Sequence, residues 1–283
     1  MTRIALPNKG RLADGARELL ERSGLEFDVR GDRALQAQLG DDFLALFVNA
    51  RDIPEFVADG AADLGITGRD LVLESAREVR VLLDLGFGRC RLALAAAEDN
   101  TLQAIPDVPD DTRVATVFPR ITESFFRDRG QRIRIVPISG AAENAPHLGV
   151  ADMIVDLVST GSTLKMNGLR EIGTIMESTA VLIARPEVES WTTTAELMTA
   201  LESVMRAQDK RYLMANVPRA QLAAVKEILP GINGPTVVDV LNGGEHVAAH
   251  AVVDRREVYR VIARLKSIGA TGILVTSIER LMP

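Results

Sequence analysis

Residues 153–164, "MIVDLVSTGSTL", join an apolar run to a loop in which small hydroxylated residues surround one glycine. The run at 153–155 predicts a buried strand, and the residues from Leu164 onward predict a helix. In open α/β sheets, ligands bind beyond the carboxyl ends of the strands, where helices begin. The stretch therefore predicts an α/β fold with a binding site at this loop.

Strand and helix patterns alternate over most of the chain, which is typical of a largely parallel sheet covered by helices. Short apolar strands are predicted at 3–7, 43–50 and 62–68, with helical patterns between them. Two further apolar runs, 90–96 and 179–186, are placed to cross between two α/β units. The pattern therefore indicates two such units rather than one continuous sheet.

The domain boundaries follow from these crossovers. We expect one domain from residues 1–90 with 180–210, and a second from residues 91–179. Two α/β units joined by two crossovers describe a periplasmic-binding-protein-like fold with a cleft between the domains. The segment 211–283 has the order βαββαβ of the ferredoxin-like split motif. The predicted fold class is therefore α/β, with two periplasmic-binding-protein-like domains and a C-terminal ferredoxin-like domain.

Two short helices are expected beside these strands. One covers 51–60, with Ile53, Phe56 and Val57 facing inward, and the other covers 141–149. Both rest on short apolar patterns alone.

Composition limits the class of protein. The chain has 283 residues, 47 % of them hydrophobic, so it can bury a substantial core. Its formal net charge of −6 argues against a general nucleic-acid-binding protein, since such proteins are usually basic. Neither an apolar signal core at the start nor a run long enough to span a bilayer is present. We expect a cytoplasmic protein that binds neither nucleic acid nor membrane.

The cysteine and histidine content argues against a soft-ligand metal site. One cysteine excludes an intrachain disulfide and fits a reducing compartment, and there are only three histidines. His246 and His250 are four residues apart, but they fall in a segment that reads as strand. Cys90 is expected to be buried packing, because no histidine is near it in the sequence.

The loop after the strand has the composition of a phosphate site. It consists of Ser159, Thr160, Gly161, Ser162 and Thr163. Unpaired backbone N–H groups at a helix start favour an anion. The glycine lets the backbone approach a ligand closely, and the hydroxyl groups add hydrogen-bond donors.

Asp156, at the end of the strand, can accept hydrogen bonds from sugar hydroxyls. A carboxylate repels phosphate, so we expect this acid to lie about a ribose width from the phosphate. An ordinary turn with a threonine cap remains the alternative for the loop. It is not a P-loop, because no lysine follows Gly161, and it is not a Rossmann fingerprint, because only one glycine is present.

Residues 143–164, "ENAPHLGVADMIVDLVSTGSTL", resemble the signature segment of the ATP phosphoribosyltransferase family. The places of that signature are filled by Glu143, Gly149, Ala151, Ile154, Asp156, Leu157, Thr160, Gly161, Thr163 and Leu164. The resemblance covers nearly the whole chain. It includes "NKGRL" (8–12), "DLGITGRD" (63–70), "LDLGFGRCRL" (83–92) and "NGLREI" (167–172).

The resemblance implies a pentosyltransferase that joins ATP to 5-phosphoribosyl-1-pyrophosphate (PRPP), the first reaction of histidine biosynthesis. Adenine N1 attacks the anomeric carbon, and pyrophosphate leaves with Mg²⁺ bound to it. The loop 159–163 would hold the 5′-phosphate and Asp156 the ribose, with Glu143 assisting at the ribose or the metal. The protein itself need not own a metal site, because pyrophosphate can carry most of the magnesium coordination.

The same resemblance places other groups on the first domain. Lys9 and Arg11 would supply cations to pyrophosphate and triphosphate, and Asp70 and Phe118 would contact the adenosine part. Arg69, Arg89 and Arg91 remain either cleft residues or surface ion-pair partners.

Two departures from the family alter the expected contacts. Asn49 stands where the family commonly has arginine, and Arg51, two places on, is the candidate substitute. Phe118 stands where tyrosine is common, so its ring could stack on adenine but a hydroxyl contact is lost.

The C-terminal unit resembles ACT-type regulatory domains of the long, histidine-inhibited form of the family. Asn216, Thr236 and Gly272 are the candidate contacts for histidine, and AMP is a second candidate inhibitor. Such domains usually pair their sheets between subunits, which implies a homo-oligomer between dimer and hexamer.

Two other readings compete with this one. A cytoplasmic small-anion or solute-binding sensor would share the two-domain fold and would bind without turnover. A phosphoribosyltransferase of the nucleotide-salvage fold also has an acid, acid, "STGGT"-like loop. Here Val155 stands at the place of the first acid, and the strand order differs.

Overall fold

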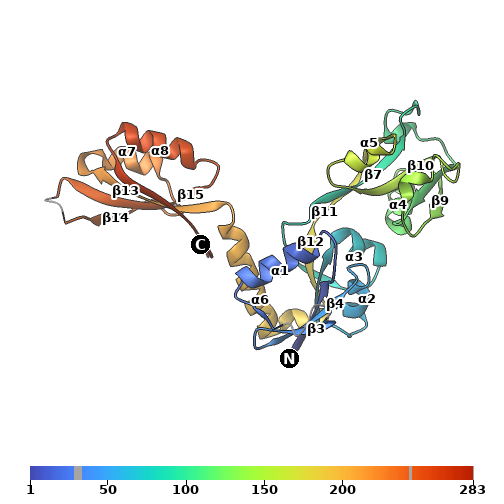
Figure 1. Ribbon diagram of the computed structural model, residues 1–283, viewed down its shortest axis with the longest axis horizontal. Helices are drawn as coiled ribbons and strands as arrows, with labels where there is room; N and C mark the ends of the chain where they lie inside the picture. The colour runs from blue at the N-terminus through green and yellow to red at the C-terminus, as the bar shows by residue number, and fades with distance from the viewer. Residues whose placement is uncertain (29–33, 242–243, 283) are drawn as a thin grey trace. The chain divides into compact units, whose positions relative to one another are not determined.

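The computed structural model of the protein describes residues 1–28, 34–241 and 244–282. These residues form two compact units, Met1–Met198 and a second unit that begins at Thr199. Figure 1 shows the elements of both units, coloured from blue at the N-terminus to red at the C-terminus. In this part of the chain, no helix is both long enough and apolar enough to cross a membrane.

The first unit contains two sheets, and the larger has parallel strands at its centre. In spatial order its strands are β2 (Phe27–Asp28), β3 (Gln36–Leu39), β4 (Phe43–Val48), β1 (Thr2–Pro7), β5 (Leu64–Gly68), β12 (Ala180–Ala184) and β6 (Arg80–Asp84). β1 pairs in parallel with β4 and β5, whereas β12 runs antiparallel to β5 and β6. The connecting helices are α1 (Ala13–Arg22), α2 (Ile53–Ala58) and α3 (Arg69–Ser75). Ile4 and Ala5 are both fully buried, as expected for a parallel strand covered on both faces.

The second sheet carries residues 153–164, which form one strand, a loop and the start of a helix. Its strands, in spatial order, are β11 (Leu169–Ser178), β7 (Cys90–Ala97), β10 (Met153–Val158), β8 (Thr112–Thr116) and β9 (Ile133–Pro137). β10, β8 and β9 are parallel, and β7 is antiparallel to β10 and β11. Its helices are η1 (Ile105–Asp107), α4 (Pro119–Arg127), η2 (Ala142–Asn144) and α5 (Ser162–Met166). Figure 1 shows α5 beside β7 and α4 beside β9.

The two sheets are connected where the sequence predicted crossovers. The chain passes from β6 to β7 through residues 85–89, and it returns from β11 to β12 through Thr179. α3 and α4 also meet across the two sheets. The Glu74 carboxylate accepts hydrogen bonds from the backbone N–H groups of Arg120 and Ile121, both at 3.1 Å. This carboxylate satisfies donors that the start of α4 leaves unpaired.

Two details of the helix prediction are wrong. The helix expected at 141–149 is only the short 3₁₀ turn η2. Pro146 has no N–H with which to continue a helix, and Ala141 is left-handed with φ 53°. In α2, Ile53 and Val57 are buried as expected, but Phe56 is 37 % exposed. Pro54 takes the inward position instead.

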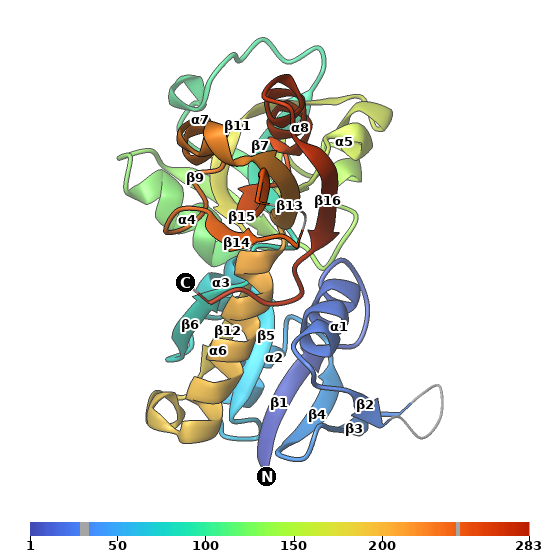
Figure 2. The same ribbon diagram turned by 90° about the vertical axis from the view of Figure 1, so that its left-hand side faces the viewer.

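The second unit has the predicted βαββαβ order. Its strands lie in the order β14 (Thr236–Asp239), β15 (His246–Asp254), β13 (Lys210–Pro218) and β16 (Thr271–Ser277), and all pairs are antiparallel. The helical elements are η4 (Arg219–Gln221), α7 (Leu222–Ile228) and α8 (Val258–Ser267), while η3 (Pro186–Ser190) and α6 (Thr192–Ala207) precede β13. In Figures 1 and 2, α7 and α8 lie on one face of this sheet. Alternate residues of β15 are buried beneath them, as one covered face requires.

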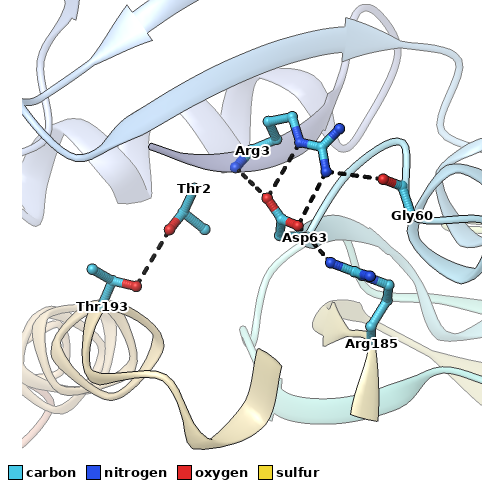
Figure 3. A network of polar contacts seen from close by, with 6 residues as sticks. All are labelled: Thr2, Arg3, Gly60, Asp63, Arg185 and Thr193. Carbon is cyan, nitrogen blue, oxygen red and sulfur yellow. Dashed lines mark hydrogen bonds and ion pairs between the residues drawn. The ribbon is translucent and has the colours of Figure 1, made fainter. Parts of the chain in front are cut away.

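A buried carboxylate ties strands of the first sheet together at the ends away from the loops described below. Asp63 has a side chain only 5 % exposed, and its oxygens accept hydrogen bonds from the Arg3 backbone N–H at 2.8 Å and from Arg185 Nη2 at 2.7 Å. Arg3 Nη2 also donates to the Gly60 carbonyl at 2.9 Å (Figure 3). Burial alone would raise the pKa of Asp63, but the hydrogen bonds from Arg3 and Arg185 hold it below its usual value.

Candidate active site

A cleft of the first unit gathers loops that follow strands of both sheets. The first sheet contributes residues after β1, β4 and β5, and the second contributes the turn after β8 and the end of β10. The residues that line this cleft include Lys9, Arg11, Arg51, Asp70, Phe118 and Asp156. Parallel strands open ligand sites at their carboxyl ends, and this cleft lies at such ends. The fold therefore brings together cations from one sheet and a carboxylate from the other.

Arg11 is anchored rather than free. Its guanidinium donates to the Gly88 carbonyl, and its Nη2 lies 3.3 Å from Asp70 Oδ1. Its side chain is nevertheless 30 % exposed. For Lys9, by contrast, no acidic partner occurs among the described residues. The sequence-predicted cations thus lie at the cleft, one held in place and one available.

Asp70 is more deeply buried than an adenosine contact would require. The residue is fully buried, and Ser178 donates from its hydroxyl to Asp70 Oδ1 while accepting from the Asp70 backbone N–H at 3.0 Å. Its second oxygen, Oδ2, has no hydrogen-bond partner in the described part of the chain. The polar contacts of the Asp70 carboxylate are therefore with Arg11 and Ser178. No feature of the sequence pointed to Ser178, and Gly88, although it falls in the quoted segment 83–92, had no role assigned to it.

Two carboxylates approach each other on the second sheet. Asp156 belongs to β10, and its Oδ1 accepts a hydrogen bond from the Leu157 backbone N–H at 2.7 Å. Burial raises the pKa of Asp156, the Leu157 hydrogen bond opposes this, and the nearby Glu143 carboxylate raises it further. Glu143 lies on η2, which packs against β10. The predicted pair of acids is therefore brought together.

The predicted phosphate loop joins β10 to α5. Gly161 has φ +82°, a conformation that favours glycine, and a Cβ there would come no closer than 3.9 Å to another residue. Thr160 Oγ1 and Ser162 Oγ are 2.9 Å apart, and α5 begins at Ser162. Neither Thr160 nor Gly161 donates its backbone N–H to an acceptor in the described ranges. These groups are available for an anion.

Arg91 contacts this loop, which settles which of the open arginines lies beside it. Its Nη1 donates to the Ser159 carbonyl at 3.3 Å, and its Nε and Nη2 bind the Glu171 carboxylate at 2.9 and 2.6 Å. Arg69 instead pairs with Asp84 at 3.5 Å. Glu171 falls in the quoted "NGLREI" segment, but nothing in the sequence assigned it a partner.

Phe118 does not face the cleft as a free stacking surface. Its ring is 1 % exposed and belongs to the core of the second sheet. The Arg51 guanidinium lies 5.6 Å from the centre of this ring. Asn49 also lines the cleft, and its Oδ1 accepts a hydrogen bond from the Arg51 backbone N–H at 3.1 Å. Stacking of Phe118 on adenine would require the ring to move, whereas Arg51 already lines the cleft.

The effector candidates are only partly assembled in the second unit. Gly272 has φ +56°, and a Cβ there would lie 3.1 Å from Asn216 Nδ2, so these two residues adjoin. Thr236 lies on β14, which β15 separates from the β13 strand of Asn216. Within one chain, Thr236 is therefore not part of the same cluster.

Cys90 and His250 have surroundings that are typical of structural residues. Cys90 is buried, which raises the pKa of its thiol and disfavours a thiolate nucleophile. His250 Nδ1 lies 3.0 Å from the Tyr212 hydroxyl on the neighbouring strand. No group of three or more histidine, cysteine or acidic side chains that could hold a metal ion occurs among residues 1–28, 34–241 and 244–282.

Comparison with known proteins gives a consistent result over the whole chain. The family described as "HisG: ATP phosphoribosyltransferase" matches residues 49–206, and "HisG, C-terminal domain" matches residues 207–280. An ATP phosphoribosyltransferase from Gemmatimonas aurantiaca is 56 % identical, with both chains covered completely. One from Methanothermobacter thermautotrophicus is 47 % identical over 99 % of each chain.

A solved structure agrees with the sequence relatives. The ATP phosphoribosyl transferase (HisG:HisZ) complex from Thermotoga maritima matches with a TM-score of 0.63 and 28 % identity, covering 73 % of this chain and 99 % of that one. The predicted fold class is confirmed. With a signature loop, a cleft of matching chemistry and relatives that span its full length, this chain belongs to the ATP phosphoribosyltransferase family.

Proposed function

We propose that the cleft is where this ATP phosphoribosyltransferase transfers the 5-phosphoribosyl group of PRPP to N1 of ATP, giving phosphoribosyl-ATP and pyrophosphate. This is the first step of histidine biosynthesis, as the names of its relatives indicate. One observation supports the location above others. The cleft unites the Asp156 carboxylate of the second sheet with Lys9, Arg11 and Arg51 of the first. A solute-binding sensor would not need these groups to converge on a sugar carbon.

The reaction asks for positioning more than for proton transfer. The lone pair of adenine N1 forms a bond to the anomeric carbon, while the bond from that carbon to pyrophosphate breaks and its electron pair leaves with the pyrophosphate. Because N1 carries no proton, no protein base is required. The loop 159–163 holds the 5′-phosphate, and Asp156 holds the ribose hydroxyls and faces the electron-poor carbon. Such alignment and charge placement supply the rate enhancement.

Lys9, Arg11 and Arg51 serve the polyphosphates. Lys9 has no acidic partner among the residues that the structure describes, so it can bind pyrophosphate without breaking an ion pair there. Arg11 stays oriented by Asp70 and Gly88. Arg51 lies at the cleft where Asn49 replaces the family arginine, and we assign it the phosphate contact that Asn49 cannot make. Asp70 acts mainly by holding Arg11, and Phe118 by supporting Arg51.

Asp156 and Glu143 fit a hard divalent cation. Mg²⁺ is typically bound by one or two carboxylates together with substrate phosphates, and these two carboxylates repel each other without it. Bound with PRPP, Mg²⁺ would neutralise charge on the departing pyrophosphate. Asp156 would then hold the ribose hydroxyls, with Glu143 assisting at the ribose or the metal.

We assign regulation to the C-terminal domain. In this proposal the domains are 1–90 with 180–210, 91–179 and 211–283, and histidine binds at Asn216 and Gly272. Thr236 would come from a second copy, because it lies on another strand of the sheet in its own chain. This arrangement requires a homo-oligomer, between dimer and hexamer. AMP is a second candidate inhibitor, and the cytoplasm stays the predicted location.

The test is product formation. Purified protein is mixed with ATP, PRPP and Mg²⁺, and phosphoribosyl-ATP and pyrophosphate are measured. We expect equal amounts of both products, and loss of both with Asp156→Asn. Saturable binding of PRPP without release of pyrophosphate would instead favour the solute-binding sensor. Inhibition by histidine, and its loss with Asn216→Ala, tests the regulatory part separately.

A further inference from the structure

The Arg91–Glu171 ion pair is tied to the phosphate loop by geometry that the reaction itself does not explain. Three donors of one guanidinium are used: Nε and Nη2 on the Glu171 carboxylate, and Nη1 on the Ser159 carbonyl. Both side chains are about one-third exposed or less, at 32 % and 28 %. A bidentate pair of this kind fixes both side chains in orientation as well as in distance.

The strand register explains why Glu171 reaches Arg91. On β7, Arg91, Ala93 and Ala95 alternate onto one face, and Glu171 is the partner of Ala95 on β11. The two intervening positions on this face are the small side chains of Ala93 and, on the neighbouring strand, Thr174. The Arg91 side chain can therefore extend along the sheet to the carboxylate.

A β-bulge orients the carboxylate. The register passes from Glu171–Ala95 to Gly173–Leu94, so one residue of β11 is left unpaired. In a regular strand, residues three apart face opposite sides, but the extra residue brings Thr174 to the side of Glu171. Thr174 Oγ1 then donates to Glu171 Oε1 at 3.2 Å. Bulges next to active sites often re-aim a side chain in this way.

The contact with Ser159 has a direct consequence for the loop. The peptide between Ser159 and Thr160 is trans and planar, so its C=O and N–H point in opposite directions. With the carbonyl held by Arg91, the Thr160 N–H must point away from Arg91. That N–H and the N–H of Gly161 have no acceptor in the described part of the chain. Arg91 therefore presets donors of the loop.

We infer that Arg91 and Glu171 are positioning residues for PRPP: the pair fixes the Ser159–Thr160 peptide so that the loop amides face the 5′-phosphate. This inference rests on the proposed phosphate role of residues 159–163. The charge of Arg91 is balanced by Glu171, and Glu177, its register partner on β11, adds a second negative charge nearby, so the pair acts through geometry and not through attraction of phosphate. Loosening either member weakens PRPP binding and leaves ATP binding intact.

The two changes that test this are Arg91→Lys and Glu171→Gln in the full-length protein. Lysine keeps the charge but cannot make the forked contact, and glutamine removes the charge that holds Arg91. We expect each to raise the KM for PRPP about tenfold, equal to about 1.4 kcal/mol, with the KM for ATP unchanged. With PRPP bound, the amides of Thr160 and Gly161 should be less protected from hydrogen exchange in both variants than in the unaltered protein.

The same sheet offers a matched control. Arg113 binds Asp152 at 2.7 Å and the Gly149 carbonyl at 2.8 Å, near the opposite end of β10. Arg113→Lys and Asp152→Asn thus disturb the same kind of contact away from the loop, and both should leave the KM for PRPP unchanged. If Glu171→Gln does not fold, Thr174→Val removes only the hydrogen bond that orients Glu171, and it should raise the KM in the same direction.

Opposite results overturn the inference. If Glu171→Gln lowers the KM for PRPP while Arg91→Lys raises it, Arg91 binds phosphate directly and Glu171 competes for it. If both raise the KM for ATP as much as that for PRPP, the pair is merely structural. Gly161→Ala separates these outcomes from the proposed function. If it leaves the KM for PRPP unchanged, the loop is not the phosphate site and the assignment of the loop fails first.

Discussion

Asp70 and Ser178, 108 positions apart, share two hydrogen bonds: the Ser178 hydroxyl donates to Asp70 Oδ1 and accepts from the Asp70 backbone N–H. Asp70 lies in the first turn of α3, beside the first sheet, and Ser178 ends β11 of the second. Their contact lies beside the crossover from β11 to β12 and against Arg11, one of the cleft cations. The cleft residue Arg11 is thus held by the Asp70 carboxylate, and Ser178 holds that carboxylate at the junction between the two sheets.

Ser178→Ala should destabilise the first unit. The change leaves the buried Asp70 carboxylate with one fewer donor, and a buried charged group that loses a hydrogen bond costs about 1–3 kcal/mol. Urea unfolding of the variant measures this loss. Ser190→Ala is the control, because the Ser190 hydroxyl is exposed and its contact with the Glu187 carbonyl is long, at 3.3 Å. An equal, small loss in both variants would show that the Asp70 contact carries no special weight.

Asp156→Asn should reduce turnover without reducing stability. Asparagine can still accept the Leu157 hydrogen bond, and it removes a charge that burial and Glu143 disfavour. The raised pKa means that this carboxyl contributes stability at low pH, and that this contribution is lost as the pH rises through the raised pKa. We therefore expect unchanged or greater resistance to urea at neutral pH. Turnover should fall by about 10²–10³, the usual cost of removing one preorganised electrostatic contact. Parallel loss of folding and activity would make Asp156 a structural residue.

The same carboxylate should set the acid limb of the pH profile. If ionised Asp156 holds the ribose, kcat/KM for PRPP falls as the pH drops through its raised pKa, above the usual aspartate value. Glu143→Gln removes a neighbouring negative charge, so the limb should move to lower pH. The profile of Glu143→Gln against that of the unaltered protein measures the shift. A limb that stays in place would mean that another group controls it.

The loop and Asp156 could be predicted from the sequence because their information is local, whereas Glu143 was predicted from the family resemblance alone. "VSTGSTL" follows its strand directly, and its glycine and hydroxyl residues carry the same meaning in any α/β sheet. The position of Arg91 could not be predicted, because its side chain is held by Glu171, 80 positions away. The β-bulge that orients Glu171 is not revealed by any periodicity in the sequence. Ser178 carried no signal at all, because a serine at a strand end is ordinary until Asp70 is seen beside it.

For Phe118 the sequence led to a clear expectation, but the burial of its side chain could not be predicted from the motif. An aromatic residue before a proline in a family motif reads as a stacking surface, but the ring is buried with Phe126 in the core of the second sheet. Hydrophobicity favours both outcomes equally, and only the path of the chain decides between them. The ring supports Arg51 instead, a role that depends on a loop of the other sheet.

Asp63→Asn should destabilise the first unit strongly at neutral pH. Its carboxylate is nearly buried between Arg3 and Arg185, and breaking such a pair costs about 3–5 kcal/mol. The lowered pKa means that this stability is present above the usual aspartate pKa and is lost as the pH falls through the lowered value. The difference in urea midpoint between variant and unaltered protein should therefore shrink in acid. Asp152→Asn provides the control, since an exposed pair is worth about 0–1 kcal/mol.

Gly272→Ala should abolish histidine inhibition while leaving catalysis intact. The new Cβ would lie 3.1 Å from Asn216 Nδ2, so the amide must move out of the place where it would meet the effector. The left-handed backbone, with φ +56°, adds about 1–2 kcal/mol of strain for a residue other than glycine. Inhibition curves with histidine, recorded beside Asn216→Ala, test whether both changes act through one site.

Thr276→Ala is the matched control for Gly272→Ala, because Thr276 lies on the same strand but pairs with Tyr212 and not with Asn216. It should keep normal inhibition. Thr236→Ala tests whether the effector site is shared between two copies of the chain. In the proposed site, Thr236 joins Asn216 from a second copy, because β15 separates the two residues within one chain. In mixtures of Thr236→Ala and Asn216→Ala chains, some sites regain both intact residues, so partial inhibition should return. Mixtures as insensitive as either variant alone would place Thr236 outside the effector site.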